Sequence, residues 1–168
     1  VEALMQGHEV YLANLNAETQ FVIAGRDEAM AEVAQLALRA GASKAQRLAV
    51  SVPSHCALLD KPAAELAKAF AGASLRRPLC AYLSGSTARV LWDPQRIADD
   101  LAMNMARPVH WQEAMVAADE RDARLAIERP PGGVLTCLTR QAGWRGEAIA
   151  LERSGLDVAR HLAQRLSD

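Results

Sequence analysis

Apolar and polar residues follow two spacings in the N-terminal part of the chain, an alternation typical of strands and a three-to-four-residue repeat typical of helices. Residues 9–15 and 20–25 are apolar runs separated by polar turn residues, which predicts a hairpin of two strands. Helical spacing covers residues 1–7 and 28–40. An apolar run at residues 45–52 predicts another strand. The order helix, strand, strand, helix, strand predicts a ferredoxin-like unit that lacks its first strand.

From residue 53 onward, longer helical patterns alternate with short apolar runs, and this alternation is typical of an α/β fold. The chain contains no internal repeat and no low-complexity tract. Helices are expected at residues 61–71, 94–104, 109–120, 134–140 and 158–166, and strands at residues 78–84, 123–128 and 148–151.

Composition excludes several classes of function. The formal net charge is −1, and no basic stripe with interleaved aromatic residues occurs, which argues against a nucleic-acid partner. No apolar run approaches the roughly 18 residues of a membrane span. Cys56, Cys80 and Cys137 are irregularly spaced, so they predict reduced thiols and a cytoplasmic location rather than a metal site or a disulfide framework.

His55 is the first candidate for chemistry. It follows the apolar run and Pro53, which ends the expected strand because proline lacks the N–H that a strand donates. A histidine on such a loop is suited to take up and return a proton near neutral pH. The alternative is a loop histidine without a chemical role. Cys56 also suggests a Cys-His pair, but adjacent residues of an extended segment point to opposite sides.

Three motifs carry a resemblance to a known family. Residues 50–67 (VSVPSHCALLDKPAAELA) resemble the catalytic-histidine segment of the malonyl-CoA:acyl carrier protein transacylases. Residues 14–25 (NLNAETQFVIAG) are similar to that family's NxNxxxQxVIAG segment, and residues 107–111 (RPVHW) to its NPVQW stretch. The family's GHSxG serine motif, its early GQG segment and its MxxR segment are absent. The chain therefore resembles the C-terminal half of such an enzyme.

The resemblance implies a fold in two parts. Residues 1–52 would form the C-terminal part of a ferredoxin-like small subdomain, and residues 53–168 the C-terminal part of an α/β-hydrolase-like large subdomain. It also implies a partner, the N-terminal half of the acyltransferase, which bears the serine nucleophile.

The family's site residues map onto particular positions here. The resemblance makes His55 the catalytic base and assigns the backbone carbonyl of Asn104 to orient its ring. The alternative for Asn104 is a helix-end asparagine that satisfies its own backbone. Asn14 and Asn16 would line the acyl pocket, or else bond locally as turn asparagines, and Ser54 could contribute a hydrogen bond to the substrate. No metal or redox cofactor is implied.

The activity implied is ping-pong transfer of a malonyl group from its coenzyme A thioester to an acyl carrier protein. Residues 128–133 (ERPPGG) replace the family's usual GPG turn, and together with the LNAETQ variant they favour the transacylase subunit of bacterial malonate decarboxylase. The alternatives are malonyl transfer for fatty acid or polyketide synthesis and a non-catalytic carrier-docking fragment. A thioesterase or hydrolase shares the α/β pattern but not the asparagine-rich segment.

Overall fold

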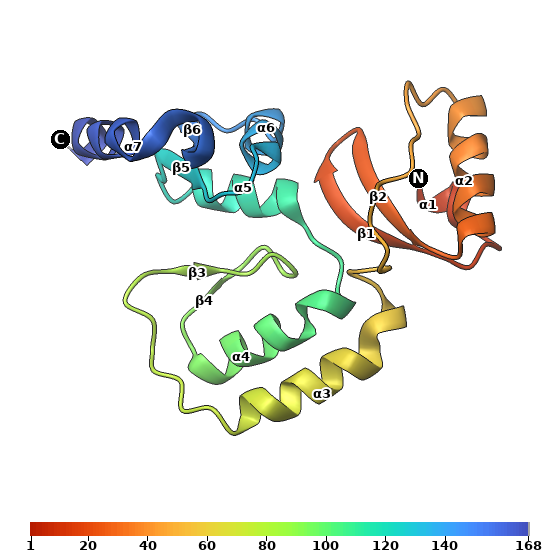
Figure 1. Ribbon diagram of the computed structural model, residues 1–168, viewed down its shortest axis with the longest axis horizontal. Coiled ribbons are helices and arrows are strands. Elements are labelled where there is room, and N and C mark those ends of the chain that lie inside the picture. The colour runs from red at the N-terminus through yellow and green to blue at the C-terminus, as the bar shows by residue number, and fades with distance from the viewer. Residues whose placement is uncertain (168) are drawn as a thin grey trace.

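The computed structural model describes residues 1–167 of the chain, and its elements form three groups that follow one another in sequence (Figure 1). Each group contains one two-stranded sheet with helices packed against it or beside it. The α/β class expected from the sequence is confirmed. Among the residues described, no sheet exceeds two strands, and no helix is both long and apolar enough to cross a membrane.

The first group is a hairpin covered by helices. Strands β1 (Val10–Ala17) and β2 (Gln20–Gly25) pair antiparallel, as the sequence predicted. The helices α1 (Glu2–Met5) and α2 (Asp27–Arg39) contact each other and pack against the hairpin. Gly25 is required by a close approach, because a Cβ atom there would lie 2.5 Å from the carbonyl oxygen of Glu9. Ala13 and Ala24 of the two strands pack with Cys56 in a small buried core, and this contact joins the hairpin to the segment that carries His55.

The strand expected at residues 45–52 is wrong. Residues 42–56 form neither helix nor strand, and Leu48, Val50 and Val52 are exposed. These three residues alternate as the apolar face of a strand would, but a strand is stabilised only by pairing with a neighbouring edge. No strand in the described part of the chain pairs with this segment. The first group therefore shows the order helix, strand, strand, helix, without the expected last strand.

The second group is built on two helices that lie side by side (Figure 1), α3 (Asp60–Ala71) and α4 (Pro94–Met103). A 3-10 turn, η1 (Ala57–Leu59), precedes α3, and another, η2 (Asn104–Ala106), extends α4. Both helices were predicted from their apolar spacing.

The strand expected at residues 78–84 is much shorter in the structure. It is reduced to β3 (Tyr82–Leu83), which pairs antiparallel with β4 (Val90–Leu91), a strand that the sequence did not indicate. Leu79 is fully exposed, so the apolar run has neither a pairing edge nor a covering layer at this point.

The third group is a strand-helix-strand unit followed by a long helix. Strands β5 (Leu125–Glu128) and β6 (Glu147–Ala150) are parallel and are connected through α6 (Val134–Gln141). Helix α5 (Trp111–Asp119) leads into the unit. Helix α7 (Leu151–Ser167) packs on both strands and is kinked at Gly155, whose φ of +76° favours glycine. The predicted terminal helix at 158–166 is the part beyond this kink.

The whole chain exposes an unusually large surface. A compact monomer of 18.1 kDa would expose about 8,100 Å². This chain exposes 11132 Å², which is about 3,000 Å² more. Large apolar side chains in all three groups contribute to the excess, among them Val50, Leu79 and Val134. The fold therefore leaves apolar faces uncovered.

Candidate active site

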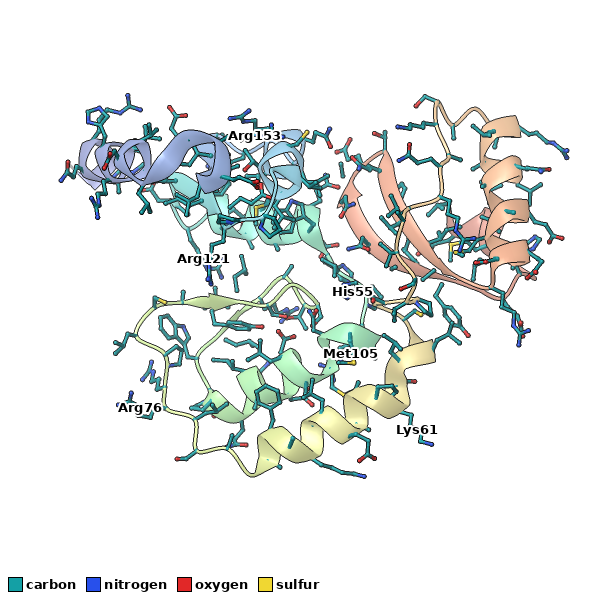
Figure 2. The ribbon with its side chains drawn as sticks, viewed as in Figure 1. His55, Lys61, Arg76, Met105, Arg121 and Arg153 are labelled. Carbon is teal, nitrogen blue, oxygen red and sulfur yellow. The ribbon has the colours of Figure 1, made fainter. Side chains whose placement is uncertain are left out.

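His55 lies at the junction of the first two groups, beside Met105 (Figure 2). Its backbone has a φ of +63°, a left-handed conformation that costs a residue other than glycine about 1–3 kcal/mol. The backbone N–H of His55 donates to the carbonyl oxygen of Met105 at 2.7 Å. This hydrogen bond holds the segment against η2, which follows α4.

The ring of His55 is oriented by a backbone carbonyl. Its Nδ1 atom lies 2.9 Å from the carbonyl oxygen of Asn104, which also accepts from the N–H of Arg107 at 3.3 Å. A carbonyl oxygen can only accept, so Nδ1 of the neutral ring carries the proton and Nε2 keeps its lone pair. Nε2 makes no hydrogen bond to any described residue. The structure thus brings His55 and Asn104 together across 49 positions, and their catalytic roles stay predictions.

Cys56 is directed away from the ring of its neighbour. Its side chain is buried, and Sγ donates to the carbonyl oxygen of Pro53 at 3.1 Å. The thiol is therefore part of the core and is not paired with His55. Ser54 is half-buried, and its hydroxyl makes no hydrogen bond within the described part of the chain. The role of Ser54 in substrate binding therefore stays a prediction.

Asn14 and Asn16 lie on β1, which is joined by backbone hydrogen bonds to the segment that follows η2. Val109 follows η2 and pairs with β1 through two backbone hydrogen bonds of 2.8 Å, one to Ala13 and one from Leu15, on either side of Asn14. Asn14 is half-buried, and Asn16 is buried without a side-chain hydrogen bond to any described residue. The structure places neither amide in hydrogen-bond contact with His55, so their binding role stays a prediction.

A buried polar cluster near the end of α4 was missed from the sequence. Asp100 is 2% exposed, and it accepts hydrogen bonds from the hydroxyls of Tyr82 at 2.7 Å, Ser84 at 2.7 Å and Ser86 at 2.5 Å. We call these four residues the Asp100 cluster. Burial of Tyr82, its hydrogen bond to Asp100 and the negative charge of that carboxylate raise the pKa of Tyr82 well above its ordinary range. One sequence signal existed, because Asp100 is an acidic residue among apolar ones at helical spacing, three positions after Ile97.

No cluster of three or more His, Cys, Asp or Glu side chains suited to a metal ion occurs among residues 1–167. The reactive group that the structure presents is the half-buried imidazole of His55, which the Asn104 carbonyl oxygen holds in the Nδ1–H tautomer. An imidazole in this tautomer has the lone pair on Nε2 that a general base needs to activate a nucleophilic side chain.

Comparison with known proteins shows which proteins the chain is similar to. No family model matches the chain. It is 33% identical to the malonyl CoA-acyl carrier protein transacylase of Haemophilus influenzae over 146 residues, which are 87% of this chain and 47% of the relative. It is 32% identical to that of Escherichia coli K12 over 140 residues, 83% of this chain and 45% of the relative. A polyketide biosynthesis acyltransferase homolog of Bacillus velezensis is 31% identical over 135 residues, covering 80% of this chain and 41% of the relative.

Solved structures agree with these relatives. A malonyl-transacylase in complex with the acyl-carrier protein of a type II polyketide synthase has a TM-score of 0.86 and 31% identity, covering 97% of this chain and 52% of the other. The transacylase of Xanthomonas oryzae has a TM-score of 0.82 and 32% identity, covering 92% and 49%. The resemblance to the malonyl-CoA:acyl carrier protein transacylases is therefore confirmed. The chain spans about half the length of the curated relatives it matches.

Proposed function

We propose that this chain is part of an acyltransferase that moves a malonyl group from malonyl-CoA to the thiol of a carrier protein. Its contribution is the base: His55 activates a serine that lies outside the 168 residues, on the half of the enzyme that this chain does not contain. The observation that carries the proposal is the 2.9 Å contact between His55 Nδ1 and the carbonyl oxygen of Asn104, which leaves Nε2 free. The named relatives support the reaction type.

The reaction follows a ping-pong course. Nε2 of His55 takes the proton of the serine hydroxyl while the serine oxygen attacks the thioester carbonyl carbon. The carbon–sulfur bond then breaks, the acyl group stays on the serine, and the departing thiolate of coenzyme A takes the proton back from Nε2. In the second half His55 deprotonates the carrier thiol, the thiolate attacks the acyl carbon of the acyl-serine, and the bond between that carbon and the serine oxygen breaks. The serine oxygen takes up the carrier's proton from Nε2, so the free serine and the neutral imidazole are restored without any redox change.

Three features of the molecule support a second protein segment that completes the enzyme. No G-x-S-x-G pattern occurs in the sequence, and Ser54 cannot replace it, because it is adjacent to the base. The exposed surface is about 3,000 Å² larger than that of a compact monomer of this mass. The parallel pair β5–β6 is open at both edges, whereas parallel sheets are normally buried in larger ones. A serine-bearing half would cover such faces.

The substrate contacts follow from the same arrangement. Asn14 and Asn16 on β1 would present amides to the acyl group, and the free hydroxyl of Ser54 would donate to or accept from the thioester or its carboxylate. The subdomain assignment at residues 1–52 and 53–168, ferredoxin-like and α/β-hydrolase-like, belongs to this proposal. So does a cytoplasmic location.

The proposal also concerns which carrier protein accepts the malonyl group. The ERPPGG turn at residues 128–133 and the LNAETQ variant favour the carrier subunit of malonate decarboxylase, whose arm is a phosphoribosyl-dephospho-CoA group. The names of the relatives favour an acyl carrier protein of fatty acid or polyketide synthesis as the second candidate. A non-catalytic carrier-docking fragment is the remaining alternative.

Intact-mass analysis of the complete acyltransferase tests this proposal. We expect a covalent malonyl adduct after mixing with malonyl-CoA, and little adduct with acetyl-CoA. The two carriers are then added separately, and the one that discharges the adduct and becomes loaded decides between the decarboxylase and the synthesis pathways. Absence of any acyl adduct would contradict the enzyme and leave the docking fragment.

A further inference from the structure

The Asp100 cluster is closed and fully satisfied. A buried carboxylate is costly unless hydrogen bonds replace its water, and three hydroxyls do so here. Hydrogen bonds to an ionised acceptor are about twice as strong as neutral ones, so the four side chains form a rigid unit. Ser84 contributes further, since its Oγ also accepts from the backbone N–H groups of Ser86 at 3.2 Å and Thr87 at 3.1 Å. The cluster therefore fixes the β3–β4 turn to helix α4.

Both elements that the cluster joins touch the segment that orients His55. Asn104 comes four residues after Asp100, one helical turn further along the same axis. From the other side, the carbonyl oxygen of Gly85 accepts from the N–H of His110 at 2.8 Å. The Asn104 side chain also lies against this turn, because a Cβ on Gly85 would be 3.9 Å from its Nδ2 atom. The chain from Asn104 to His110 is thus held at both ends.

We propose that Asp100 is a positioning residue for His55. With the hydroxyls of Tyr82, Ser84 and Ser86 it holds α4 and the β3–β4 turn in the one arrangement that keeps the Asn104 carbonyl within hydrogen-bond reach of the imidazole. Asp100 is 2% exposed and no hydrogen bond joins it to the ring among the described residues, so it would act through the backbone. The inference rests on the proposed function, in which His55 is the base.

The first test measures the acylation step in the complete acyltransferase. Asp100→Ala leaves three buried hydroxyls without their acceptor, so the turn and the helix end are free to shift. A misplacement of about 1 Å at a catalytic group can cost about 100-fold in rate, and we expect a loss of that order in kcat for serine malonylation. The KM for malonyl-CoA should not change, because the buried Asp100 carboxylate is not accessible to the substrate.

Asp99→Asn is the matched control. It removes the same charge from the neighbouring position of the same helix, but Asp99 is exposed and pairs only with Arg107, at 3.1 Å. Exposed ion pairs contribute little, so this variant should keep the wild-type rate.

The second test observes the imidazole directly. In the wild type, the ¹⁵N shifts of the neutral His55 ring should report the Nδ1–H tautomer, and in Asp100→Ala a mixture of tautomers should replace it. Circular dichroism establishes that the variant is folded. If Asp100→Ala does not fold, Ser86→Ala removes one of the three donors and should give a smaller change of the same kind.

The outcomes separate the two proposals. A folded Asp100→Ala variant with the wild-type kcat and tautomer would overturn the positioning role, provided that His55→Ala is inactive. A fully active His55→Ala variant would instead overturn the proposed function itself.

Discussion

Three properties of His55 define its place in the structure. Its backbone adopts a left-handed conformation, its N–H is bound by Met105, and its Nδ1 faces the carbonyl oxygen of Asn104. Strained backbone persists only where surrounding contacts enforce it, and the two contacts from the end of α4 do so. A carbonyl partner fixes the tautomer as an aspartate would, without adding a second charge. The residue is therefore held ready for proton transfer at Nε2.

Cys56 should be dispensable for catalysis. The thiol is buried in the core with Ala13 and Ala24 and is bonded to the Pro53 carbonyl. We expect Cys56→Ala to remain folded, with slightly lower stability, and to form the malonyl-serine at the wild-type rate, as measured by intact mass over time. A folded Cys56→Ala protein without acylation would instead support a Cys-His pair.

Tyr82 should make the stability of the protein fall in alkali. Burial, the hydrogen bond to Asp100 and that carboxylate's charge raise the pKa of Tyr82 above its ordinary value of 10.0, so the folded protein holds the phenol proton more tightly than the unfolded chain does. The contribution is complete below pH 10.0 and is lost as the pH rises through the folded pKa.

Urea titrations below and above pH 10 should therefore show a falling free energy of unfolding. The Tyr82→Phe variant, which has no phenol proton at this position, should show a smaller fall. Equal falls in both proteins would mean that Tyr82 ionises equally easily in the folded and unfolded states.

Helix α4 is the element on which the site depends. Its first turn is capped by Asp93, whose Oδ1 accepts from the N–H of Arg96 at 2.8 Å, and Pro94 occupies the first position. Its last turn leads to Asn104 and Met105, which bind His55. The N-terminal cap and the buried face therefore belong to α4, and the residues that bind His55 follow directly after it in η2.

Loss of this cap should weaken the helix measurably. Asp93→Ala should lower the free energy of unfolding by about 0.5–2 kcal/mol, as found for other N-cap residues, when measured by denaturant titration. Asp93→Asn keeps an acceptor oxygen and should restore most of that loss. If both variants are equally destabilised, the effect comes from the charge of Asp93 and not from the cap.

The elements that the sequence predicted well are those specified by nearby residues. Asp93 and Pro94 mark the start of α4 by themselves, and the hairpin follows from two apolar runs around a polar turn. The strands expected at residues 45–52 and 78–84 failed for the opposite reason. Their apolar pattern is real, but a strand is completed by a neighbouring edge. The described part of the chain offers no such edge to residues 45–52 and only the two-residue strand β4 to residues 78–84.

The site residues also divide into those that nearby sequence indicates and those that only the family resemblance or the fold indicates. Pro53 and the loop position drew attention to His55 from the residues alone. The Asn104 contact came only from the family resemblance, because nothing local links positions 55 and 104. The Asp100 cluster was missed because its four members lie in three separate elements, and only the fold brings their hydroxyls to one carboxylate.

At the scale of the whole molecule, the surface is the dominant feature. About 3,000 Å² beyond the value for a compact monomer is more than a standard protein–protein interface buries in total. Apolar side chains in all three groups share this excess, and the β5–β6 pair has two open edges. These observations fit an enzyme whose base is on this chain and whose nucleophile is on a second, extensive segment.

Rapid-quench mass spectrometry can follow the rate at which the complete acyltransferase forms malonyl-serine. This rate shows whether His55 is the general base. Because general-base catalysis contributes about 10²–10⁴-fold, His55→Ala should be slower by a factor in that range. His161→Ala, an exposed histidine of α7, should react like the wild type. A His55→Ala enzyme that acylates at the wild-type rate would show that His55 is not the base.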